Sequence, residues 1–67
     1  MRQLTSTEIT ELANRPGIKR IAVENFLGSM DDNANDAKQN LQLDAGLYKW
    51  NSQTVKAIRD GIKLATA

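Results

Sequence analysis

The sequence predicts an all-α protein, a compact and small orthogonal bundle of four helices in a single domain over residues 1–67. Three observations support this prediction. Apolar residues recur at spacings of three and four along the chain, no window alternates apolar and polar residues as a half-buried strand does, and polar capping residues precede several apolar stretches. A chain of 67 residues forms one small hydrophobic core and no more.

The first helix is expected to begin after Thr5 and to end before Pro16. Thr5 and Glu8 have the three-residue spacing of a reciprocal capping box. The apolar residues that follow have the spacing of one helical face: Ile9, Leu12 and Ala13. Proline disfavours helical geometry in the residue before it, and Gly17 then supplies a tight turn.

The second helix is expected over about residues 18–30. Its apolar residues line one side, with Val23 and Leu27 beside them: Ile18, Ile21, Ala22, Phe26 and Met30. Because this apolar face is wide for a short helix, we expect the second helix to be the most buried element. Gly28 and the polar residues 31–33 end it.

The third helix is expected to begin between Asn33 and Asp36, which are good capping residues. Its apolar set is Ala37, Leu41, Ala45 and Tyr48. Gly46 costs about 1 kcal/mol relative to alanine inside a helix, so the helix is expected to bend or break there. The bundle would then have three helices and a broken one.

The fourth helix is expected to start after the Asn51-Ser52 cap and to run to about Ala65. Its core-facing residues are Val55, Ile58, Ile62 and Ala65. On another face, three cations at positions i, i+3 and i+7 form a basic stripe: Lys56, Arg59 and Lys63.

The composition argues against an enzyme. The chain has no cysteine and no histidine, so it lacks thiolate metal ligands, disulfides, the commonest general base and the commonest metal ligand. We therefore expect no catalytic residues, no cofactor and no metal. Residues 31–36 resemble the start of a calcium loop, but the sixth position lacks glycine and Gln42 occupies the twelfth, so we expect a helix-capping loop.

Nothing in the sequence predicts a membrane protein. No apolar run approaches the roughly 20 residues that span a bilayer, and the N-terminal residues lack the apolar stretch of a signal peptide. A cytoplasmic or nuclear location is the expectation. The start at Met1 favours a whole chain or an N-terminal piece.

The stretch from Ile9 to Phe26 has the pattern of two helices that meet at a steep corner. Such a corner needs a small residue where the helices cross and a glycine in the turn, and Ala13 is followed by Gly17 four residues later. Apolar residues occupy the wedge positions on both sides: Leu12, Ile18, Val23 and Phe26. The stretch resembles the helix-turn-helix family of DNA-binding proteins. Pro16, where the family keeps a helical residue, is a departure from that pattern.

The resemblance implies that the second helix docks in the major groove of DNA, in a regulatory protein. The residues that it implies as base or phosphate contacts are Lys19, Arg20, Glu24 and Asn25. Arg15 at the turn would suit a phosphate, and Lys56, Arg59 and Lys63 could neutralise further phosphates. Net charge is only +1, but an acidic segment at residues 31–48 lies between two more basic ones. A homodimer is a further expectation, because so small a domain touches few bases.

Two alternatives remain open at this point. The segment Leu12 to Ile18 also resembles the hairpin of helix-hairpin-helix proteins, with Lys19 in place of that family's second glycine. Residues 37–58 are loosely similar to ubiquitin-associated domains, which implies a protein-interaction module or a subunit of a larger assembly. Exposed Leu43 or Leu47 would serve such a role, and Trp50 is expected to anchor the core.

Overall fold

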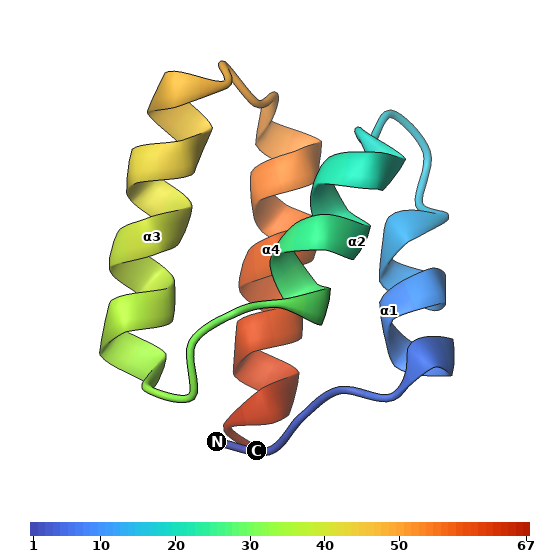
Figure 1. Cartoon of the computed structure of the whole chain (residues 1–67). Helices are drawn as coiled ribbons and strands as arrows, with labels where there is room; N and C mark the ends of the chain where they lie inside the picture. The colour runs from blue at the N-terminus through green and yellow to red at the C-terminus, as the bar shows by residue number, and fades with distance from the viewer.

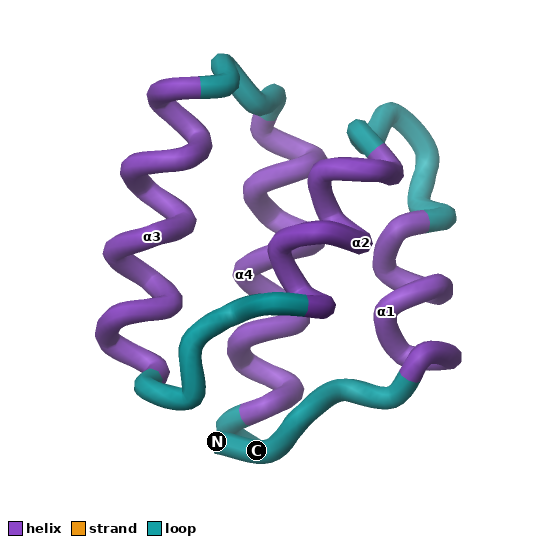
Figure 2. The backbone as a smooth tube through the Cα atoms, in the orientation of Figure 1, coloured by secondary structure: helices purple, strands orange, loops and turns teal.

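The computed structural model describes residues 1–67 and consists of four α-helices, which confirms the predicted all-α class. The helices are α1 (Ser6–Ala13), α2 (Arg20–Gly28), α3 (Ala34–Leu47) and α4 (Ser52–Ala65). Figure 1 shows α3, α4 and α1 from left to right, with α2 in front of α4. Figure 2 shows the same chain with loops between helices and no strand.

Polar side chains cap three of the four helices at the predicted residues. Thr5 and Glu8 form both bonds of a reciprocal capping box at the start of α1. The Asn33 side chain accepts two backbone N–H bonds from the first turn of α3, so the predicted cap is confirmed, with residues 34–36 already in the helix. The Asn51 side chain caps α4 in the same way.

Helix α4 is the centre of the bundle, because α1, α2 and α3 all pack against it. Neither α1 nor α2 packs against α3. The buried residues of α4 are Thr54, Ala57, Ile58, Gly61, Ile62 and Ala65. The prediction that the second helix is the most buried element is therefore wrong. A peripheral helix meets α4 with one face only, whereas α4 meets three neighbours.

The predicted apolar side of α2 is only partly correct. Val23, Phe26 and Leu27 are buried, but Ile21 is 67% exposed. Ile21 precedes Val23 by two residues and so projects about 200° away around the helix. Ile18 and Met30 lie outside α2, which is shorter than expected, and are half-buried.

Helix α3 continues through Gly46, so the predicted break does not occur. Nothing lies within 4 Å of the position that a Cβ atom would take at Gly46. Ala37 and Leu41 are buried against α4 as expected. Tyr48, which was expected on this apolar face, follows the last residue of α3 and is 57% exposed.

Gly61 allows α1 and α2 to approach α4 closely. A Cβ atom at this position would lie 2.6 Å from Leu27 Cδ2 of α2 and 3.3 Å from Leu12 Cδ1 of α1. Both leucines are buried. The absence of a side chain at Gly61 therefore creates the space into which the two leucines pack.

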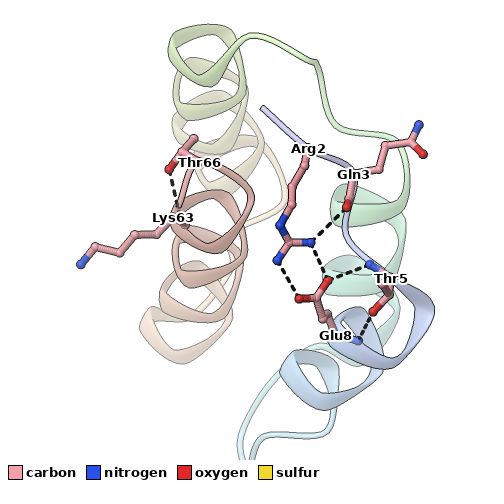
Figure 3. A network of polar contacts seen from close by, with 6 residues as sticks. All are labelled: Arg2, Gln3, Thr5, Glu8, Lys63 and Thr66. Atoms are coloured by element: carbon pink, nitrogen blue, oxygen red, sulfur yellow. Dashed lines mark hydrogen bonds and ion pairs between the residues drawn. The ribbon is translucent and has the colours of Figure 1, made fainter.

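Arg2 fastens the N-terminal segment to the end of α4 and to the first turn of α1. Its backbone N–H donates to the Ala65 carbonyl at 3.0 Å, which places the two chain ends side by side. Its guanidinium donates to both carboxylate oxygens of Glu8, at 2.9 and 2.7 Å (Figure 3). Hydrogen bonds from Arg2 and from the Thr5 backbone lower the pKa of Glu8 to about 2.

We predict an acid-sensitive contribution to stability from Glu8. Because its pKa is lowered in the folded chain, the carboxylate stabilises the fold fully above its ordinary pKa of 4.5. This contribution is lost as the pH falls from 4.5 towards about 2. Thermal unfolding followed by circular dichroism should show a steeper fall of the midpoint over this range in wild type than in Glu8→Gln. Glu11→Gln, which changes an exposed carboxylate outside any ion pair, should keep the wild-type profile.

The two glycines inside α3 and α4 should respond oppositely to alanine. Gly46→Ala should raise the free energy of unfolding by about 0.5–1 kcal/mol, because the site is open and alanine favours the helix. Gly61→Ala should lower it by about 1 kcal/mol, since the added methyl displaces Leu27 and overpacking outweighs helix propensity. Urea denaturation measures both changes. Equal stabilisation by the two substitutions would contradict close packing at Gly61.

Candidate functional site

A groove separates α2 from α3, because both helices pack on α4 and not on each other. Its volume is about 600 Å³. Eleven residues line it: Lys19, Ile21, Ala22, Asn25, Phe26, Ser29, Met30, Asn40, Asp44, Tyr48 and Trp50. Six of them are apolar, so the groove is suited to an apolar occupant with a few polar contacts.

Three aromatic rings stand in a row at one end of the groove. Phe26 is buried and meets Trp50 edge to face, with ring centroids 6.2 Å apart. Tyr48 stacks on Trp50, with ring centroids 5.7 Å apart. Trp50 is half-buried and packs against the core, as expected of its anchoring role, but it also lines the groove.

The backbone at the end of α3 sets the position of these aromatic residues. Lys49 has a φ of 54°, in the left-handed region, and the Trp50 N–H donates to the Ala45 carbonyl at 3.1 Å. This is the hydrogen bond of a Schellman turn, in which glycine is the usual left-handed residue. The turn reverses the chain between α3 and α4 and leaves Tyr48 at the groove and Lys49 exposed.

Exposed apolar side chains gather around this groove. The structure exposes five large apolar residues: Ile21, Leu43, Leu47, Tyr48 and Leu64. Ile21 and Tyr48 line the groove itself. Leu43 and Leu47 are about 70% exposed. They lie three and seven residues after Asn40, which lines the groove, and so share one face of α3 with it. The predicted exposure of these two leucines is confirmed.

The corner between α1 and α2 is held by the start of α4. Residues 14–19 connect the helices, which is longer than the three or four residues of a helix-turn-helix turn. Gly17 has a φ of 72°, as expected of a glycine in a tight turn. The Asn51 side-chain amide donates to the Gly17 carbonyl, and the Lys19 N–H donates to Thr54 Oγ1 at 2.9 Å.

The residues predicted to contact nucleic acid are all at the surface but are divided among three places. Lys19 and Asn25 are exposed and line the α2–α3 groove. Arg20 and Glu24 lie outside the groove and pair with each other, at 3.0 Å. A carboxylate thus neutralises part of the positive charge at the start of α2.

The remaining predicted contacts lie around α4. Arg15 pairs with Asp60 at 2.6 Å, and Lys56 approaches the same carboxylate oxygen at 3.7 Å. The hydrogen bond from Arg15, with the neighbouring Lys56 charge, lowers the pKa of Asp60. Arg59 and Lys63 are exposed and have no ion-pair partner. With Lys56 they occupy the side of α4 opposite its buried residues.

The predicted nucleic-acid set omitted the apolar wall of the groove. Leu43 and Leu47 could be noticed in the sequence because they fall outside the apolar face of α3 that contains Ala37 and Leu41. Ile21 and Tyr48 both fit apolar helical faces in the sequence, although the helix-turn-helix pattern often leaves the position of Ile21 facing solvent. Ile21 is exposed because it projects away from the buried face of α2, and Tyr48 is exposed where α3 has ended.

Comparison of the chain with protein-family models, with curated proteins and with solved structures finds no match in any of the three. No group of three or more acidic, histidine or cysteine side chains is placed to hold a metal ion. None of the four helices combines the length and the apolar character needed to cross a membrane.

Proposed function

We propose that this chain is a small binding module that receives an apolar segment of a partner protein in the α2–α3 groove. The observation that carries the proposal is the clustering of exposed apolar residues at one site. Four of the five large exposed apolar side chains line or flank the groove: Ile21, Leu43, Leu47 and Tyr48. Scattered apolar residues are normal on a protein surface, whereas a cluster at a groove is typical of an interaction site.

An amphipathic helix fits the form of this site. Helix-in-groove recognition uses apolar anchors at positions i, i+3 or i+4, and i+7 of the bound helix. The groove has helices on both sides and Met30 and Trp50 between them, so it offers apolar contacts along its length. Covering a leucine or isoleucine side chain contributes about 1.5–3 kcal/mol before the costs of association. Polar residues such as Asn25 and Asn40 would fix the orientation of the occupant.

We predict that a synthetic amphipathic helical peptide with leucine anchors binds the groove in a saturable manner. Trp50 is the only tryptophan and lines the groove, so its fluorescence should shift to shorter wavelength as the peptide excludes water. Ile21→Ser and Leu47→Ser should each weaken binding about ten-fold, the loss expected for one apolar anchor. Leu64→Ser on α4, outside the groove, is the matched control. Equal weakening by all three substitutions, or no saturable shift, would refute the proposed site.

Nucleic-acid binding is the second candidate. It is favoured by two exposed residues, Lys19 directly before α2 and Asn25 within it, whose side chains have no ion-pair or hydrogen-bond partner. Lysine is suited to phosphate or guanine, and asparagine to adenine. Arg59 and Lys63 provide further unpaired positive charge on α4. The net charge of +1 and the ion pairs of Arg15 and Arg20 weigh against strong binding.

If nucleic acid is bound through α2, affinity for labelled mixed-sequence duplex DNA should fall steeply with salt, because bound cations are released. Lys19→Ala/Arg20→Ala should weaken binding about ten-fold and reduce its salt dependence. Arg59→Ala/Lys63→Ala removes the same amount of charge from α4. A larger loss of affinity in this variant would indicate that the basic stripe of α4, and not α2, contacts the DNA. Fluorescence anisotropy at two salt concentrations measures both. Absence of salt-dependent binding at micromolar protein would exclude this candidate.

A further inference from the structure

The charges around the groove are segregated between its two ends. Figure 1 shows the α1–α2 and α3–α4 loops at one end of the molecule, and the α2–α3 loop with both termini at the other. The first end carries Lys19 and Lys49, and the second carries Asp31, Asp32 and Asp36. All five side chains are exposed, and none forms an ion pair within the chain.

Other charges near the groove leave this polarity unchanged. The amino group of Met1 donates to the Asp32 carbonyl at 3.2 Å, and the C-terminal carboxylate lies at the same end of the molecule. Lys38 is exposed two residues after Asp36 but on another face of α3. Asp44 is half-buried on the α3 wall, between the two ends. The groove therefore runs from a basic end to an acidic end along an apolar wall.

We propose, on the basis of the function proposed above, that the occupant of this groove is a second copy of the same chain, docked antiparallel about a two-fold axis. In an isologous dimer the same surface of both copies meets itself. A two-fold axis across the groove brings the basic end of each copy to the acidic end of the other. Docking in the same direction would instead bring like charges together.

The sequence of α3 indicates where the axis passes. Asp36, Leu43 and Leu47 share one face of the helix, at positions i, i+7 and i+11. At 1.5 Å per residue, Asp36 lies about 10 Å before Leu43 and Leu47 about 6 Å beyond it, and Lys49 follows in the turn after the helix. An axis at Leu43 therefore sets Asp36 of each copy beside Lys49 of the other and packs the two Leu43 side chains together.

Such a dimer would also cover the apolar residues that the single chain exposes. Ile21 and Tyr48 line the groove, and Leu43 and Leu47 border it. A second copy supplies apolar contacts and the opposite charge pattern in the same register. Its charges complement both ends of the groove.

Sedimentation equilibrium tests the dimer directly. Between about 10 µM and 1 mM protein, the average mass should rise from 7.4 kDa towards twice that value. Leu43→Glu should raise the dimer dissociation constant about ten-fold or more, because it places two like charges at the axis. Gln42→Glu introduces the same charge on another exposed face of α3 and should leave the constant unchanged.

A charge exchange tests the antiparallel orientation. Asp36→Lys and Lys49→Glu should each weaken self-association about five-fold or more, because each creates two like-charge contacts in its own dimer. A one-to-one mixture of the two variants should associate as wild type does, since both contacts then join opposite charges. Restoration on mixing also excludes misfolding as the cause of either loss, and circular dichroism checks each variant separately.

The outcomes distinguish this inference from the proposed function. A chain that remains monomeric at about 1 mM and yet binds the amphipathic peptide retains the binding groove and overturns the dimer. A dimer unaffected by Leu43→Glu overturns the assignment of the interface. Single charge variants that associate like wild type, or a mixture that fails to recover, overturn the antiparallel register. Self-association that competes with the peptide supports both proposals.

Discussion

The fold depends on the close approach of α1 and α2 to α4 at Gly61. A side chain there would meet Leu27 and Leu12, which instead fill the space directly over the α4 backbone. Ala57 and Ala65 continue this narrow seam along the buried side of α4. Because large leucines pack over small residues, three helices with few aromatic side chains form a closed core.

The seam also determines where the bundle remains open. Helices α1 and α2 pack on one side of α4, and α3 packs on the other side without contacting α2. The space between α2 and α3 is the groove, and the rings of Phe26 and Trp50 meet in its lining. The polar bonds from Asn51 and Thr54 to the α1–α2 corner hold the groove wall in place. The groove thus exists because α1, α2 and α3 all pack against α4 while α2 and α3 do not pack against each other.

Ion pairing decides which charges remain available to a partner. Arg15 and Lys56 share Asp60, Arg20 pairs with Glu24, and Arg2 pairs with Glu8. These pairs are exposed and contribute little to stability, except that Glu8 also completes the cap of α1. They neutralise three of the six cations predicted to contact nucleic acid: Arg15, Arg20 and Lys56. Unpaired charges remain at the two ends of the groove and on the outer side of α4, and also at Glu11, Lys38 and Asp44.

The sequence by itself determined the helical class, the first residues of three helices and most of the core. Capping at Thr5, Asn33 and Asn51 is local chemistry between residues two or three apart, and helical periodicity follows from the same short range. Only the tertiary structure decided that α4 is central, that Ile21 and Tyr48 are exposed and that Arg15 is paired with Asp60, 45 residues away. An apolar face shows that a side chain suits burial, but whether it is buried depends on how many neighbours the helix has. That number is set by contacts between residues far apart in the chain, which no local pattern specifies.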